Sequence, residues 1–255
     1  MPSTSPWLVE ITAAEQTGCQ DVFYAVPHAG GGVATVRDLC QLVGAFASSA
    51  AVRLPAREAR LDEPPMRDVL QIAQLCGEAI ADHAAGRPIT MYGHCSGAII
   101  AFEVARYLQS RNLRALFLSG HAAPDRIPLS YAWQLPASAF VEQVTKDGYM
   151  PDFVVDDDEL LELILPALRA DYEAVESYWP QDGARLDVEI TAILGEAETG
   201  VSQEDLAAWS DFTSAGLTMH TLPGGHNLLL DHADDVAELI IAGSGWRARC
   251  VQADA

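Results

Sequence analysis

Short apolar stretches recur along the chain and are separated by longer amphipathic ones. Runs rich in β-branched and aromatic residues predict strands at 22–26, 50–54, 89–92, 115–119, 188–194 and 217–222. Helical periodicity fills most of the intervals, for example at 69–84. Because alternating strands and helices are typical of βαβ units, we predict an α/β protein, a three-layer sandwich around a mainly parallel sheet.

The interval 124–180 departs from this alternation. It contains no convincing strand, but helical patterns occur at 137–145, 158–165 and 166–178. An insertion between core strands usually lies at the carboxyl edge of the sheet, where it can cover a site. We therefore predict one domain spanning 1–255, with a helical lid insertion at 124–180.

Composition narrows the function classes. The chain is 49% hydrophobic and has a net charge of -21, which would repel nucleic acid and anionic membrane surfaces. No apolar run is long enough to cross a bilayer and no leader of signal-peptide type is present, so we expect a cytoplasmic protein. The five cysteines are scattered without a Cys-x-x-Cys pair, which favours reduced thiols over a zinc site or a disulfide framework.

The segment 93–97, Gly-His-Cys-Ser-Gly, has the pattern of a nucleophile elbow with cysteine at its centre. An apolar run precedes it and a helical run, 98–108, follows it. A thiol at a helix N-terminus is favoured as thiolate, the reactive form. Cys95 is therefore a candidate nucleophile, and the alternative is a buried structural thiol.

Candidate partners follow other predicted strands. The turn 223–227 after the last strand presents His226 as a candidate base, and the acidic loop after strand 188–194 offers Glu198, with Glu196 as second choice. The glycine-rich segment 27–32 lets backbone N–H groups approach a ligand. We expect the N–H groups of Ala29 and Ser96 to form an oxyanion hole.

These segments carry a family resemblance that covers nearly the whole chain. It resembles the type II thioesterases of nonribosomal peptide and polyketide assembly lines, which belong to the α/β-hydrolases, in segments 23–31, 54–61, 93–97, 101–106, 118–120, 165–172 and 223–226. The resemblance implies a mobile helical lid over an acyl pocket and a triad of Cys95, Glu198 and His226. It also implies acyl groups carried on the phosphopantetheine of an acyl or peptidyl carrier protein. The chemistry requires no metal and no redox cofactor.

Three positions depart from the family pattern, which normally has serine at 95, aspartate at 198 and glycine at 56. An acyl group on Cys95 stays a thioester of energy similar to the pantetheine thioester, so it keeps its activation. This favours transfer to a second nucleophile over loss to water. We therefore predict an enzyme that takes an acyl or aminoacyl group onto Cys95 and releases it by transfer to an amine, hydroxyl or thiol, or by hydrolysis.

Two other hypotheses about the function remain open. One is a free-standing cysteine hydrolase of small lactones, like the dienelactone hydrolases, which also use a cysteine elbow. The other is a catalytically silent binding module that has retained the fold.

Several other side chains are candidates with structural alternatives. We expect substrate contacts from His28 and from lid residues, although aromatic residues at helical spacing often form core; the lid candidates are Trp133, Phe140, Met150 and Phe153, with Tyr149 and Tyr178 also considered. Arg57 and Arg60 have two interpretations, contact with a pantetheine phosphate or pairing with acidic residues close in sequence. We expect the second, and the acidic residues are Glu58, Asp62 and Glu63.

Overall fold

The computed structural model describes residues 5–13, 20–108, 112–150, 152–181 and 183–247, and its centre is one seven-stranded sheet. The strand order is β1-β3-β2-β4-β5-β6-β7. The strands are β1 (Leu8–Thr12), β2 (Val22–Val26), β3 (Ser48–Val52), β4 (Ile89–His94), β5 (Leu113–Ser119), β6 (Ile190–Gly195) and β7 (Leu217–Leu222). β1 pairs antiparallel with β3 and every other pairing is parallel. The predicted α/β sandwich with a mainly parallel sheet is confirmed.

Two strands differ from the sequence prediction. β1 was not predicted, because this short edge strand is partly exposed along its length and lacks a continuous apolar pattern. β3 begins at Ser48, two residues before the predicted run. Ser48 and Ser49 are buried, and their hydroxyl groups donate to the carbonyl oxygens of Asp21 and Cys40. Polar residues whose hydrogen bonds are satisfied inside a strand are invisible to a search for apolar runs.

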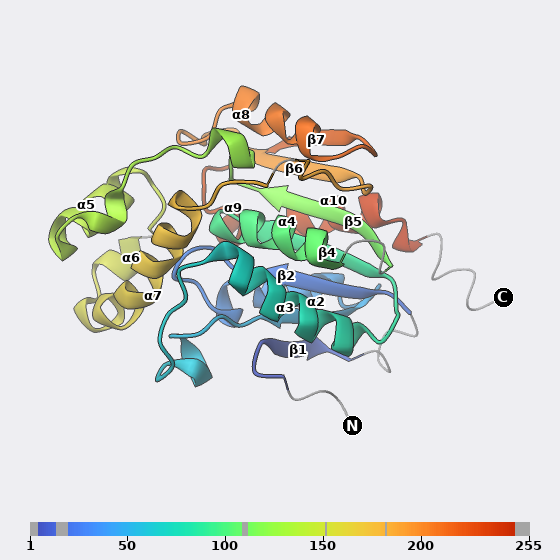
Figure 1. The fold of residues 1–255 in the computed structure, drawn as a ribbon, viewed down its shortest axis with the longest axis horizontal. Helices are drawn as coiled ribbons and strands as arrows, with labels where there is room; N and C mark the ends of the chain where they lie inside the picture. The colour runs from blue at the N-terminus through green and yellow to red at the C-terminus, as the bar shows by residue number, and fades with distance from the viewer. Residues whose placement is uncertain (1–4, 14–19, 109–111, 151, 182, 248–255) are drawn as a thin grey trace.

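Helices cover both faces of the sheet (Figure 1). α3 (Val69–Ala84) and α4 (Ser96–Leu108) pack on one face, and α2 (Arg37–Val43) and α10 (Ala233–Ser244) on the other. Along β2, Tyr24 belongs to the first core and Phe23 to the second, as expected from the two-residue period of a strand. No helix in the described part of the chain is long and apolar enough to span a membrane.

The remaining short elements connect these layers. They are η1 (Val33–Val36), η2 (Glu58–Arg60), α8 (Gln203–Ala207), η5 (Ala208–Phe212) and α9 (Leu228–Asp231).

The interval 124–180 forms helices beyond the carboxyl ends of the parallel strands, the end toward which the β5 arrow points in Figure 1. They are η3 (Pro124–Arg126), η4 (Ala132–Gln134), α5 (Ala137–Lys146), α6 (Asp152–Val155) and α7 (Asp158–Glu176), and no strand occurs among the interval's described residues. The two helices predicted at 158–165 and 166–178 are one helix, because α7 continues through Pro166. These helices lie where a lid would lie, and that role stays a prediction.

Candidate active site

The turn at Cys95 is the sharpest feature at the carboxyl edge of the sheet. Only this residue separates β4 from α4, and its φ of 53° lies in the left-handed region. A Cβ at Gly93 would lie 2.2 Å from the carbonyl oxygen of Gly97, and a Cβ at Gly97 would lie 2.4 Å from that of Pro27. Glycine is therefore required on both sides of the turn, which presents the partly exposed Cys95 thiol to a cavity.

His226 and Glu198 form a hydrogen-bonded pair beside this thiol. The imidazole Nδ1–H of His226 donates to Oε2 of Glu198 at 2.6 Å, and Oε1 of the same carboxylate accepts from the backbone N–H of Gly200 at 2.7 Å. Both side chains are nearly inaccessible to solvent. Because Nδ1 carries the proton in this arrangement, Nε2 is the ring atom that can exchange a proton with Cys95. Nε2 is buried and makes no hydrogen bond of regular geometry within the described residues.

The pKa values of His226 and Glu198 are shifted by the charged groups around them. Burial disfavours a charged imidazole, but the Cys95 thiolate and the Glu198 carboxylate outweigh it and raise the pKa of His226 to about 10. Burial likewise disfavours the Glu198 carboxylate, yet its hydrogen bond to His226 lowers the pKa of Glu198 below its usual value. The geometry therefore favours a charged His226 imidazolium between Cys95 and the Glu198 carboxylate.

Only one of the two candidate acids is in position. Glu196 lies two residues earlier in the same loop and its side chain is exposed. Glu198 is the acid that the fold brings to His226.

The predicted oxyanion donors lie at the same cavity. Ala29 follows β2 and Ser96 is the first residue of α4, and both line the cavity with Cys95. Within the described residues neither backbone N–H donates to another group of the chain. The two N–H groups are therefore available to an oxygen atom bound beside the sulfur.

The cavity has a volume of about 340 Å³ and lies between the sheet edge and the helices of 124–180. The sheet edge contributes Ala29, Cys95, Ser96, Gly120, His121 and His226. The helical interval contributes apolar and polar walls, among them Ile127, Pro128, Tyr149, Tyr172, Val175 and Glu176. A cavity of this size with a few convergent polar groups is typical of a small-molecule site.

Tyr149, from the interval 124–180, makes a ring contact with His226. Its ring centroid lies 4.2 Å from that of His226, with the planes inclined by 47°. It was one of the aromatic residues considered as pocket candidates, and it does line the cavity.

The other predicted pocket residues do not line this cavity, and this part of the prediction is corrected. Phe140 and Met150 are buried in a small core of the helical interval, whereas Phe153 is 62% exposed. Trp133 is half-buried away from the cavity wall. Phe140 and Met150 instead pack the helices of the interval onto one another, whereas Phe153 faces solvent.

His28 and Tyr178 also have structural contacts in place of cavity contacts. Nδ1–H of His28 donates to the carbonyl oxygen of Ala29 at 3.0 Å, and the hydroxyl of Tyr178 donates to Glu103 at 2.5 Å.

His94, next to the elbow, lies beside His226 with ring centroids 5.2 Å apart. Its Nδ1 is hydrogen-bonded to the hydroxyl of Ser119 at 2.8 Å. Burial, with smaller contributions from neighbouring histidines, holds the pKa of His94 well below its usual value. Two adjacent histidines therefore have opposite charge preferences, because only His226 has anionic neighbours.

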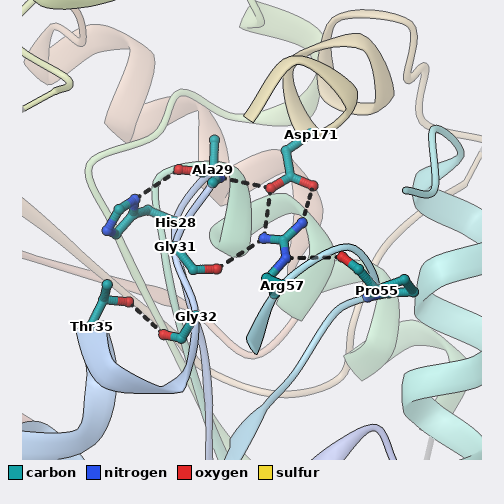
Figure 2. Close-up of polar contacts among 9 residues, drawn as sticks. His28, Ala29, Gly31, Gly32, Thr35, Pro55, Arg57 and Asp171 are labelled. Carbon is teal, nitrogen blue, oxygen red and sulfur yellow. Dashed lines mark hydrogen bonds and ion pairs between the residues drawn. The ribbon is translucent and has the colours of Figure 1, made fainter. Parts of the chain in front are cut away.

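Arg57 is the clearest departure from the expected pairing. Its guanidinium forms a two-pronged ion pair with Asp171 of α7, at 2.9 and 3.0 Å (Figure 2). Arg60, by contrast, pairs with Glu63 as predicted. Asp171 was not singled out from the sequence, and its only signal is its place in segment 165–172, which carried part of the family resemblance.

The two other cysteines within the described residues differ from Cys95 in burial. Cys40 and Cys76 are buried, and burial raises the pKa of Cys40 to about 12 and that of Cys76 further. Cys19 and Cys250 lie outside the described residues. Within those residues, no group of three or more His, Cys, Asp or Glu side chains is placed to hold a metal ion.

Comparisons with known proteins agree with this geometry. The family model for the thioesterase domain matches residues 22–243. The chain is 34% identical over 245 residues to phenyloxazoline synthase MbtB of Mycobacterium tuberculosis (strain ATCC 25618 / H37Rv), covering 94% of this chain but 17% of that much longer protein. It is 30% identical to thioesterase PikA5 of Streptomyces venezuelae, covering 89% of this chain and 84% of the relative.

Among solved structures, the type II thioesterase BorB from the borrelidin biosynthetic cluster superposes with a TM-score of 0.84 at 29% identity. The superposition covers 93% of this chain and 97% of BorB. An elbow after β4, an acid after β6 and a histidine after β7, together with a family match over most of the chain, lead to one conclusion: the chain belongs to the thioesterase family and has its α/β-hydrolase fold.

Proposed function

We propose that this protein is a cysteine-dependent thioesterase-family enzyme of natural-product biosynthesis. It takes an acyl or aminoacyl group from a carrier-protein thioester onto Cys95 and releases it by transfer or hydrolysis. The observation that carries the proposal is the arrangement of Cys95, His226 and Glu198 at one cavity, with the backbone N–H groups of Ala29 and Ser96.

In the first step the Cys95 thiolate attacks the carbonyl carbon of the bound thioester. The electron pair of the carbonyl bond moves to oxygen, and the Ala29 and Ser96 N–H groups stabilise the charge. When the carbonyl re-forms, the bond from carbon to pantetheine sulfur breaks, and the proton held on Nε2 of His226 passes to the departing thiolate. The products are a thioester on Cys95 and the free carrier thiol.

In the second step neutral His226 removes a proton from an acceptor, which attacks the acyl carbon and displaces the Cys95 thiolate. Glu198 holds the imidazole with Nδ1 protonated and stabilises its charged form. Because a thioester replaces a thioester in the first step, the acyl group keeps its activation. The acyl group can therefore be transferred to an amine, hydroxyl or thiol acceptor, or to water.

The relatives support a carrier-bound substrate. PikA5 is named a thioesterase, and BorB is described as a type II thioesterase of a biosynthetic cluster. The proposed partners are therefore an acyl or peptidyl carrier protein and a small-molecule acceptor or water. The proposed steps use only side chains and backbone groups of this chain.

The test is intact-mass analysis after mixing with an acyl-loaded carrier protein, followed by addition of candidate acceptors. We expect the protein to gain the mass of the acyl group and the Cys95→Ala variant to gain none. Consumption of the adduct by one acceptor class identifies a transferase, and rapid loss to water identifies a hydrolase. Turnover by Cys95→Ala at the native rate would refute the proposal.

Two further assays distinguish the other two interpretations. Activity on free lactones without any carrier would indicate a hydrolase of the dienelactone type. If Cys95 reacts with iodoacetamide no faster than the buried Cys40 and forms no acyl adduct, the protein is a binding module.

A further inference from the structure

The loop 28–32, which carries the proposed oxyanion donor Ala29, is bound on one side by groups that do not take part in the chemistry. Figure 2 shows Arg57 and Asp171 against the side of this loop. The backbone N–H of Gly30 donates to Oδ2 of Asp171 at 2.8 Å, and Nη1 of Arg57 donates to the carbonyl oxygen of Gly31 at 2.9 Å. The two residues that follow Ala29 are thus bound by the two members of one ion pair, Gly30 through its N–H and Gly31 through its carbonyl oxygen.

The pair itself is buried and extensively hydrogen-bonded. The side chains of Arg57 and Asp171 are 7% and 3% exposed. Within the described residues the guanidinium of Arg57 donates four hydrogen bonds: two to Asp171, one to Gly31 and one from Nε to the carbonyl oxygen of Pro55 at 3.1 Å. A guanidinium and carboxylate in this two-pronged geometry fix direction as well as distance. The Asp171 carboxylate also lines the cavity, and it already accepts three hydrogen bonds, two from Arg57 and one from Gly30.

The pair also joins two parts of the fold that are distant in sequence. Arg57 follows β3 and Asp171 lies in α7, within the interval 124–180. α7 approaches the loop closely, because a Cβ at Gly30 would lie 3.1 Å from Cβ of Leu168. Ala29 and Leu168 belong to the same apolar cluster. The position of Ala29 therefore depends on how α7 packs against the loop 28–32.

Stability alone does not explain such a pair. A buried ion pair is often no more stabilising than apolar side chains of similar volume, because both charges lose their hydration. Apolar side chains at these two positions would not form the hydrogen bonds to Gly30 and Gly31.

We infer that Arg57 and Asp171 are positioning residues that hold the oxyanion loop in place and link it to α7. This inference rests on the proposed function, because it assigns the pair to an acylation step at Cys95. Acylation needs the Ala29 N–H in position, whereas alkylation of the same sulfur does not.

The experiment compares two reactions of Cys95 in the full-length protein. With p-nitrophenyl acetate, sulfur attacks the ester carbonyl, a negative charge develops on oxygen, and p-nitrophenolate leaves. With iodoacetamide, sulfur displaces iodide from a methylene carbon and no oxyanion forms. The variants are Asp171→Asn, which keeps the shape of the side chain, and the double variant Arg57→Met with Asp171→Leu, which leaves no unpaired buried charge.

We expect acylation to slow by about 30-fold or more in the double variant and less in Asp171→Asn, whereas the alkylation rate stays within about threefold of the native rate. Loss of a single oxyanion donor typically costs about 100- to 1000-fold, so a displaced donor costs somewhat less. The matched control is Arg106→Met with Glu103→Gln, which removes the charges of a comparably buried ion pair of α4, keeps an acceptor for the Tyr178 hydroxyl and is expected to leave the acylation-to-alkylation ratio unchanged.

Each other result overturns the inference. Equal acylation rates in native and variant proteins show that the pair does not position the loop. A parallel fall in both reactions shows a general disturbance of the site. If the native protein itself forms no acyl adduct at Cys95, the proposed function fails and the inference fails with it, a result distinct from the other two.

Discussion

The sheet edge and the helical interval 124–180 contribute to the site in different ways. Every proposed reacting group lies within a few residues of a strand end: Ala29 after β2, Cys95 after β4, Glu198 after β6 and His226 after β7. The helical interval contributes the cavity walls and one ion-pair partner, Asp171.

The difference reflects how each region is held together. The strands are hydrogen-bonded to neighbours and packed on both faces, so the turns that follow them are fixed in position. The interval 124–180 has a separate small core, and Phe153 and Leu163 are exposed. A rigid edge suits groups that must meet within hydrogen-bonding distance, whereas walls of helices can be varied to suit an acyl group.

The strongest test of the sheet edge is Glu198→Gln. We expect it to lower kcat/KM for a thioester substrate by about 1000-fold, because an amide can donate to Nδ1 of His226 and hold the imidazole in the wrong tautomer. Glu196→Gln is the matched control, an exposed residue of the same loop that should leave the rate within about twofold. Equal losses in the two variants would contradict the assignment of the acid.

The contribution of the helical interval is expected to be smaller. Tyr149→Ala removes the ring that lies against His226 and should lower kcat/KM by about fivefold, since an aromatic contact of this kind is worth about 1 kcal/mol. Phe153→Ala, in the same interval but exposed, should have no effect on steady-state kinetics. An unchanged rate in Tyr149→Ala would show that the helices only enclose the site.

The two neighbouring histidines of the sheet edge should respond to pH in opposite directions. The pKa of His94 is lowered by burial, so below about pH 6.5 this histidine is protonated in the unfolded chain but not in the folded chain. The folded state therefore loses stability as the pH is lowered. The pKa of His226 is raised to about 10, so its contribution to stability is complete below about 6.5 and is lost as the pH rises through 10.

The measurement is the free energy of unfolding by urea between pH 5 and 10.5. Relative to the native protein, His94→Gln should weaken the loss of stability on acidification by about 1 kcal/mol per pH unit below 6.5. His226→Gln should weaken the loss on the alkaline side. The same pH slope in native and variant proteins would show that these environments do not differ as described.

The smallest expected effect concerns Ala56, which precedes Arg57 and has a φ of 62°. A left-handed conformation costs a residue other than glycine roughly 1–2 kcal/mol, and the greater freedom of glycine in the unfolded chain returns part of this. Ala56→Gly should therefore raise the free energy of unfolding by about 0.5 kcal/mol. Ala59→Gly, three residues later in η2, should lower it by about 0.5–1 kcal/mol. Equal effects in chemical denaturation would contradict the strain at position 56.

Much of this protein could be predicted from the sequence because its signals are local. The strand and helix patterns predict the parallel sheet, and the glycines of segment 93–97 predict the sharp turn at Cys95. The helices of 124–180 were expected for the same reason, although Pro166 suggested a break that the folded helix does not have. Helical periodicity and strand patterns follow from the preferences of residues close in sequence.

Only the tertiary structure decided which distant groups meet. Glu196 and Glu198 are equivalent in sequence, and the path of the chain after β6 selects Glu198. Arg57 has acidic neighbours in sequence, yet it pairs with Asp171, 114 residues away, because α7 packs against the loop after β2. The physical reason is that a charge pairs with the partner that the packing of apolar surfaces brings within reach, and that packing involves the whole chain.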